Sequence, residues 1–365
     1  MVTVAIDNDA RIVGRSVSAP NAFRVHRDAL QLMSGNNLTQ PLVFQPIFME
    51  RVWGGRRLES LFGKRLPPAV RIGESWEMVD RPEAQSVVHD GPLRGLTLHA
   101  LWRKHRAQVF GNVPDGPSSP RDESVRSADR TGGSRFPILA KLLDAQENLS
   151  LQVHPPAAIA KELGGEPKSE FWYFADAVPG AKIFVGLKKS STRGEFVKAL
   201  KHGKVLSHAH QIPVQTGDAM FLPSGRLHAV GAGNLIVEIQ QNSDTTYRIF
   251  DWDRVKKGGA PRKMHIAEAL QCIDFGDREP ALFKPEGESF VKDSIFEIEK
   301  WLLPEEREIA PIGSFAIVVG LTGAFEYAGV AFKPGDFFLV PAQLRDRMVR
   351  PVAENVSLLR VTLPL

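Results

Sequence analysis

The sequence has almost no cysteine: Cys272 is the single cysteine among 365 residues. One thiol cannot form a disulfide within the chain, which fits a reducing compartment or a disulfide-free design. No apolar run approaches the roughly 18 residues that cross a bilayer. Residues 1–40 also lack the charged-then-apolar pattern of a secretory signal. We therefore expect a cytoplasmic protein that does not enter a membrane.

The chain also has little excess of one charge sign over the other. The chain has 46 Lys and Arg against 42 Asp and Glu, a formal net charge of +4, and a pI of about 9.1. No basic run is interleaved with aromatic residues as a nucleic-acid groove requires, so no nucleic-acid partner is expected. The small excess could steer a phosphorylated substrate, or it is an ordinary mildly basic surface. No obligate protein partner is inferred.

Turn residues between short apolar runs predict a mainly β protein with short helical insertions. Residues 1–40 are polar and irregular and are expected to form a flexible N-terminal extension. A first domain is expected at 41–276, interrupted by a long loop at 113–134 that is rich in Pro, Gly, Ser and charge. Residues 277–289 are interpreted as a linker, and residues 290–365 as a second β domain.

Three helices are expected within the first domain. Apolar residues at helical spacing indicate one helix at 97–110, with Thr97 as its N-cap. The same spacing predicts a surface helix at 193–202 and a short helix at 265–273.

A turn–strand–turn pattern surrounds His228. Gly217 opens a turn, five residues form a strand, and Pro223-x-Gly225 makes a second turn, after which His228 begins the next strand. Its side chain can there point into a small barrel. The G-x5-P pattern recurs at 335–341, without the following Gly and His. This repeat indicates two related β-sandwich halves, of which only the first keeps metal ligands.

Further metal ligands are expected upstream of His228. Gln152 and His154 are two residues apart, so on a strand their side chains face the same side. With Glu170 and His228, two imidazoles, one carboxylate and one amide oxygen can converge on one point. This donor set suits one Zn²⁺ per chain, with a position left open for water or substrate.

The spacing around His228 resembles the second cupin motif. The segment 149–155, followed by Lys168-Ser169-Glu170, is similar to the type I phosphomannose isomerase family, and further matches lie at 52–55, 72–77 and 240–248. The resemblance runs from about Leu42 to the C-terminus. It implies a cupin fold of two jelly-roll halves. It also implies a zinc-dependent isomerase that interconverts mannose 6-phosphate and fructose 6-phosphate through a cis-enediol(ate).

The resemblance further implies catalytic roles. Arg248 would lie over the active site, where its planar guanidinium suits the negative charge of an enediolate. Glu238, ten residues before Arg248, is a candidate for the general base. Lys168 is the other candidate, because an ammonium group beside a cation gives up its proton more readily. The choice between them stays open.

Two residues are expected to contact the substrate. Arg254, six residues after Arg248, matches a basic family position that suits the phosphate. Ser150 shares the strand face of the predicted ligands and could bond a phosphate or a hydroxyl.

The sequence departs from the longer family members at Pro167, where they carry a histidine. This places the chain in the shorter, bacterial-type subgroup and weakens any mechanism that uses that histidine as the base. Alternatives remain at this stage. They are an iron dioxygenase, which usually has three histidine ligands, a cupin isomerase acting on another sugar or sugar phosphate, and a non-catalytic sugar-binding cupin.

Overall fold

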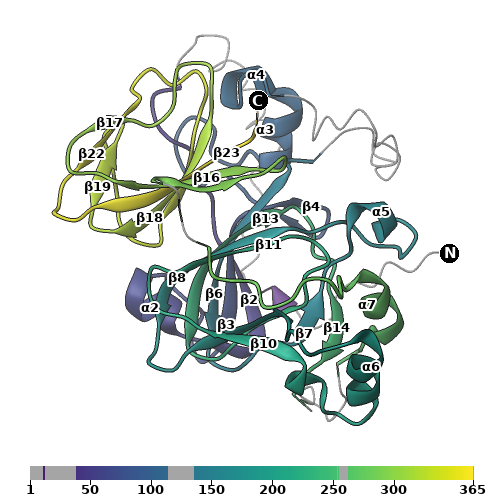
Figure 1. Cartoon of the computed structure of the whole chain (residues 1–365). Helices are drawn as coiled ribbons and strands as arrows, with labels where there is room; N and C mark the ends of the chain where they lie inside the picture. Colours follow the sequence, from purple (N-terminus) through teal and green to yellow (C-terminus); the bar gives the residue numbers. More distant parts are fainter. Residues whose placement is uncertain are drawn as a thin grey trace.

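The computed structural model describes residues 11–12, 38–113, 135–252, 254, 262–283, 285 and 287–364. Within these ranges the chain is mainly β, as predicted, and its strands form four larger sheets and a small hairpin (Figure 1). Most of the predicted extension at 1–40 lies outside the described residues. So does the predicted loop at 113–134, apart from Val113.

Two antiparallel sheets form the part of the chain that carries the predicted ligands. The seven-stranded sheet has the order β1 (Arg11–Ile12), β2 (Ile47–Gly55), β3 (Ile72–Met78), β6 (Ile138–Ala145), β13 (Asn234–Gln241), β8 (Glu170–Ala177) and β11 (Ala219–Leu222). The five-stranded sheet has the order β10 (Ala209–Pro213), β9 (Lys182–Leu187), β12 (His228–Val230), β7 (Leu151–Val153) and β14 (Tyr247–Phe250). A small hairpin pairs β4 (Asp80–Arg81) with β5 (Ala84–Gln85).

The C-terminal part holds another two sheets. One has the order β15 (Ser289–Lys292), β16 (Glu297–Leu302), β23 (Ser357–Thr362), β18 (Ala316–Thr322) and β21 (Phe337–Val340). The other has the order β17 (Arg307–Glu308), β22 (Met348–Pro351), β19 (Phe325–Tyr327) and β20 (Val330–Phe332).

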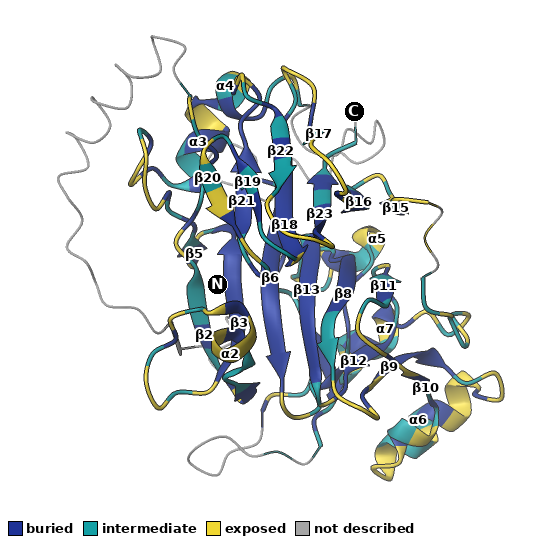
Figure 2. Ribbon diagram, turned by 90° about the vertical axis from the view of Figure 1, so that its left-hand side faces the viewer, coloured by how far each residue is buried: buried dark blue, intermediate teal, exposed yellow. Residues whose placement is uncertain are grey.

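The central strands of the seven-stranded sheet are buried on both faces, as the dark blue of β6 and β13 in Figure 2 shows. Alternate residues of a strand point to opposite faces. In β13, Val237 and Ile239 join an apolar cluster that also contains Ile317 and Leu359 of the C-terminal sheet. Glu238, between them, therefore faces the five-stranded sheet. One core thus connects both parts of the chain, and the division at 277–289 stays a prediction.

The described helices are short and lie at the edges of the sheets. They are α2 (Arg57–Phe62), α3 (Leu98–Lys104), α4 (Arg106–Val109), α5 (Ala157–Ala160), α6 (Arg193–Lys201), the 3₁₀ turn η2 (Val205–Ser207) and α7 (Ile266–Cys272). Helices α6 and α7 confirm the predictions at 193–202 and 265–273. No helix of the described residues has the length and apolar character to cross a membrane.

The prediction of one helix at 97–110 is wrong. The chain leaves helical geometry at His105, where φ is −125° and ψ is 25°, so α3 and α4 are separate. Apolar spacing alone does not reveal such a break between two helices, because the apolar residues of both helices face the same core. Thr97 caps α3 as predicted, accepting a hydrogen bond from the backbone N–H of Ala100 at 3.0 Å.

The turn–strand–turn pattern around His228 is confirmed. Gly217 and Gly225 have φ of 93° and 92°, values that favour glycine, and they flank β11. His228 is the first residue of β12. The later copy of the pattern has the same form, with Gly335 at φ 82° followed by β21.

Candidate active site

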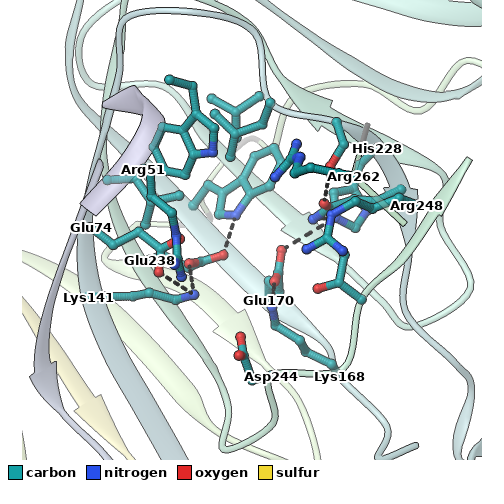
Figure 3. A pocket seen from close by; sticks show the side chains of 18 residues that line it. Arg51, Glu74, Lys141, Lys168, Glu170, His228, Glu238, Asp244, Arg248 and Arg262 are labelled. Carbon is teal, nitrogen blue, oxygen red and sulfur yellow. Dashed lines mark hydrogen bonds and ion pairs between the residues drawn. The ribbon is translucent and has the colours of Figure 1, made fainter. Parts of the chain in front are cut away.

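A pocket lies where side chains from both sheets of the ligand-bearing part meet (Figure 3). The seven-stranded sheet contributes Lys141 from β6 and Glu238 from β13, and the five-stranded sheet contributes His228 and Arg248. Each of these four residues lies between two apolar neighbours in the chain that belong to the hydrophobic cores. The site is therefore built on sheet geometry, which holds side chains in place more firmly than loops do.

His154, Glu170 and His228 form a buried group that could hold a metal ion, which we call the ligand cluster. One donor atom from each lies within 4.8 Å of the others. His154 Nε2 is 3.1 Å from Glu170 Oε1, and His228 Nε2 is 3.7 Å from Glu170 Oε2. His154 Nε2 and Glu170 Oε2 are buried without a hydrogen-bond partner among the described residues, and Glu170 Oε1 forms an ion pair with Lys168. Buried polar atoms rarely stay unsatisfied, so this donor set fits a cation.

Both histidines are held in the form that a metal requires. The Nδ1–H of His154 donates to the carbonyl of Thr245 at 2.8 Å, and that of His228 donates to the carbonyl of Arg226 at 2.9 Å. A carbonyl can only accept, so the lone pair of each ring lies on Nε2, which faces the cluster. Burial and the nearby Lys168 lower the pKa of His154 to about 3, and burial lowers the pKa of His228. Both rings are therefore neutral at physiological pH.

The side chain of Gln152 also reaches the ligand cluster, but its amide nitrogen, and not its oxygen, faces His228. Its Nε2 lies 3.3 Å from His228 Nε2, and its Oε1 accepts a hydrogen bond from Ser150 Oγ at 3.0 Å. Rotating the amide by 180° exchanges the two atoms and brings the oxygen toward the cluster. The Ser150 hydroxyl can accept as well as donate, so it can hold either orientation. Ser150 thus contacts Gln152 directly.

Strand register brings three of these residues into one row. Gln152 on β7 lies directly opposite His228 on β12 and opposite Arg248 on β14. Residues opposite one another on neighbouring strands have adjacent side chains. We call Arg248, Gln152 and His228 the ligand row.

A second row lies on the seven-stranded sheet. Glu238 on β13 is opposite Lys141 on β6 and Trp172 on β8. Its carboxylate lies 3.0 Å from Lys141 Nζ and accepts a hydrogen bond from Trp172 Nε1 at 3.0 Å. Burial and the negative charge of Glu170 raise the pKa of Glu238 to about 7, although Lys141 opposes the shift. We call these three residues the carboxylate row.

Lys168 lies beside the ligand cluster, on the side shared with Glu170 as its spacing predicts. Its Nζ is 2.7 Å from Glu170 Oε1, and both side chains are buried. Burial opposes ionisation of Glu170, but the positive charge of Lys168 outweighs it and holds the pKa of Glu170 well below its usual value.

Sequence reasoning assigned no role to several residues that line the pocket: Arg51, Glu74, Lys141, Asp244 and Arg262. Arg51 Nε and Glu74 Oε1 are 2.8 Å apart, and Lys141 Nζ is 3.8 Å from Glu74 Oε2. Burial lowers the pKa of Lys141, but Glu238 and Glu74 outweigh it and raise the pKa above its usual value. The sequence does contain a signal for Lys141, because it is the one charged residue in the apolar run 136–143. A buried cation needs carboxylate partners, so this position predicts an ion pair.

Two arginines that follow β14, Arg254 and Arg262, differ in whether they line the pocket. The sequence analysis expected Arg254 to contact the substrate and assigned no role to Arg262. Arg254 does not line the pocket, and its Nη2 is 2.6 Å from Asp251 Oδ1. Arg262 does line the pocket and holds the same carboxylate through Nε at 2.6 Å and Nη2 at 2.5 Å. Of the other predicted site residues, all but His154 line the pocket, and His154 contacts Glu170, which does.

Known proteins are similar to this chain in sequence and in fold. Residues 42–173 match the model of the phosphomannose isomerase type I catalytic domain. The chain is 33% identical over 332 residues to the mannose-6-phosphate isomerase ManA of Bacillus subtilis, covering 87% of this chain and 98% of that protein.

Solved structures show the same fold. The crystal structure of the mannose 6-phosphate isomerase from Bacillus subtilis has a TM-score of 0.74 and 33% identity, covering 88% of this chain and 99% of that chain. A mannose 6-phosphate isomerase bound with zinc and yttrium has a TM-score of 0.64 at 18% identity, covering 89% of this chain and 100% of that chain.

Proposed function

We propose that this chain, which belongs to the type I phosphomannose isomerase family, interconverts mannose 6-phosphate and fructose 6-phosphate through a cis-enediol(ate), with zinc in the ligand cluster. One observation supports this most strongly. Glu170 and His228 of the buried His–Glu–His group line the same pocket as a second buried carboxylate, Glu238.

The residues that would hold zinc are His154, Glu170 and His228, joined by Gln152 once its amide is rotated. Bound there, zinc would act as a Lewis acid that polarises the oxygens at C1 and C2 of the open-chain sugar. Cys272 is buried in an apolar cluster away from these donors and takes no part.

Glu238 is the proposed general base. Its carboxylate removes the proton from C2 of the aldose, and a C1–C2 double bond forms as the C1 carbonyl becomes a hydroxyl. The C1 oxygen gains the proton that the C2 hydroxyl gives up, directly or through solvent. The proton held by Glu238 then adds to C1, and C2 becomes the ketone. A carboxyl group kept by burial near neutral pKa suits transfer in both directions. Lys168, the other candidate, is paired with Glu170 at 2.7 Å, and Glu238 is paired with Lys141 at 3.0 Å, so the choice of Glu238 rests on its raised pKa.

Arg248 is proposed to stabilise the negative charge that develops on the sugar oxygens. It lies in the ligand row, beside the amide of Gln152, and lines the pocket. A guanidinium stays charged throughout and presents two donors to two neighbouring oxygens. Lys168 lies close enough to the cluster to help orient the same oxygens.

Arg248→Ala is expected to lower turnover by about 10²- to 10³-fold, the usual cost of removing one oxyanion donor, with zinc content unchanged. Steady-state kinetics and metal analysis of the purified variant measure both quantities. Arg345→Ala, an exposed arginine of the C-terminal part, is the control and should keep wild-type turnover. Wild-type turnover in Arg248→Ala would remove this residue from the mechanism.

A coupled isomerase assay with mannose 6-phosphate tests the proposed function. Chelator treatment followed by dialysis is expected to abolish turnover, and stoichiometric zinc should restore it. An active enzyme that keeps full turnover after its metal is removed would contradict the role of zinc. Oxygen uptake without isomerisation would favour the dioxygenase alternative, and sugar binding without turnover would favour the non-catalytic one.

A further inference from the structure

Residues 223–226 form a turn that touches both histidines of the ligand cluster, and we call it the ligand turn. The backbone N–H of Gly225 donates a hydrogen bond to the carbonyl of His154 at 2.9 Å. The carbonyl of Arg226 accepts the hydrogen bond from the Nδ1–H of His228 at 2.9 Å. One turn therefore holds the backbone at one histidine and the ring orientation of the other.

The ligand turn also contacts the segment that carries the third member of the cluster. The backbone N–H of Ser224 donates to Ser169 Oγ at 3.1 Å, and Ser169 immediately precedes Glu170. Contacts that orient metal ligands from outside raise the affinity of the site, because the donors then need no rearrangement when the ion binds. Whatever holds the ligand turn in place should therefore help to hold the ion.

An ion pair between Arg226 and Asp277 anchors the ligand turn. Arg226 Nε is 2.8 Å from Asp277 Oδ2, and Arg226 Nη2 is 2.9 Å from Asp277 Oδ1, so the pair is bidentate. The exposed fractions of the two side chains are 17% and 15%. The third nitrogen, Nη1, donates to the carbonyl of Phe221 on β11 at 2.8 Å. A partly buried, bidentate pair restrains an arginine more firmly than an exposed contact does.

Asp277 is itself held in place, although it begins the segment 277–289 that the sequence predicts as a linker. Its carbonyl accepts a hydrogen bond from the N–H of Leu187, the last residue of β9, at 3.0 Å. Strand β9 is the neighbour of β12 in the five-stranded sheet. Just before this segment, the N–H of Asp274 donates to the carbonyl of Gly225 at 2.9 Å. The anchor is therefore fixed to the same sheet as the ligands.

We propose that Asp277 is a positioning residue of the metal site, which holds Arg226 and through it the ligand turn and the ligand cluster. The inference rests on the proposed function in one respect, that zinc is the ion of the cluster. Neither Arg226 nor Asp277 lines the pocket. The pair therefore acts on the affinity for the ion and not on the binding of the sugar.

Zinc titration of Asp277→Asn against a competing chelator tests the proposal. The amide has the size of the carboxylate but no charge, so the packing is kept and the bidentate ion pair is lost. The Kd for zinc is expected to rise by about 10-fold, the lower end of the usual 10- to 100-fold cost of losing an outer contact of a metal site. At saturating zinc, kcat and KM should both stay within about 3-fold of the wild-type values, because the pair touches no substrate.

Glu299→Gln is the matched control. In the C-terminal part, Arg360 Nη1 is 2.8 Å from Glu299 Oε2, and the exposed fraction of this arginine is 17%, equal to that of Arg226. The control removes a comparable ion pair away from the ligand turn and should leave the Kd for zinc unchanged. Thermal unfolding of both variants measures what the loss of such a pair does to the fold alone.

An unchanged zinc Kd in Asp277→Asn would overturn the proposal, whatever its unfolding temperature. A loss of turnover that saturating zinc does not restore would also contradict it. The double variant Arg226→Met/Asp277→Asn should bind zinc no more weakly than the weaker single variant, because both changes remove the same pair, and additive losses would refute the link between them. If Asp277→Asn does not fold, Arg226→Lys keeps the charge without the bidentate geometry and should raise the zinc Kd by about 3- to 5-fold.

Zinc titration requires no turnover, so it separates this proposal from the proposed function. A wild-type protein that binds zinc more tightly than Asp277→Asn but does not isomerise the sugar would contradict the function and leave the role of Asp277 standing. An active isomerase whose zinc Kd is the same in Asp277→Asn would contradict the role of Asp277 alone.

Discussion

His228→Ala is expected to lose bound zinc and isomerase activity together. The imidazole supplies one of two nitrogen donors, and its Nε2 is aimed at Glu170 Oε2 by the hydrogen bond from Nδ1–H to Arg226. Removal of a supporting residue alone costs a zinc site about 10- to 100-fold in affinity, so loss of a ligand should cost at least about 100-fold. Metal analysis after dialysis and the coupled assay measure the two losses.

His89→Ala is the matched control for this variant. His89 is exposed, and the side-chain interaction that the described residues show for it is with the neighbouring Asp90, at 3.2 Å. It should keep zinc and activity at wild-type levels. Full zinc occupancy in His228→Ala, with a circular dichroism spectrum like that of the wild type, would show that the ion is held elsewhere.

Glu238→Gln is expected to lower kcat by about 10²- to 10⁴-fold, the usual contribution of a positioned general base, with zinc still bound. The amide has the size of the carboxylate and can accept the hydrogen bond from Trp172, but it cannot take up a proton. Exchange of the substrate C2 hydrogen with deuterated solvent, followed by NMR, should stop in the variant. In the wild type, activity should fall as the pH drops below about 7, because protonation removes the base.

Lys168→Met separates the two candidate bases. If Glu238 is the base, Lys168→Met weakens catalysis but still exchanges the C2 hydrogen, whereas Glu238→Gln does not. The reverse result would assign the proton transfer to Lys168. Glu326→Gln on β19 controls for the loss of a strand carboxylate outside the pocket and should leave exchange unchanged.

Local signals in the sequence predicted how single ligands are placed on their strands, and the resemblance to the isomerase family joined them into one cluster. The glycines at 217 and 225 have positive φ and place His228 at the head of a strand, a consequence of turn chemistry that needs no knowledge of distant residues. The i, i+2 spacing of Lys168 and Glu170 likewise predicted that their side chains lie together. The roles of these residues remain predictions until the variants are measured.

Residues whose position depends on sheet order could not be predicted in this way. Lys141 contacts Glu238 because β6 and β13 are neighbours, although nearly 100 positions separate them in the sequence. Arg262 follows a stretch without periodicity, so no pattern indicated that it, rather than Arg254, would line the pocket. Pairing between distant strands is a property of the assembled fold.

The ligand row has a consequence for how this enzyme can change over time. Its three side chains are spaced by the distance between neighbouring strands, about 4.8 Å, which backbone hydrogen bonding sets. A single deletion inside β7 would turn Gln152 to the opposite face of the sheet and disrupt the ligand row. Insertions in the turns on either side of β7 would leave the spacing of the row unchanged. Insertions and deletions that arise in this protein should therefore be found mainly in the turns. The same turns are the positions where changes of loop length could be introduced to alter the sugar preference.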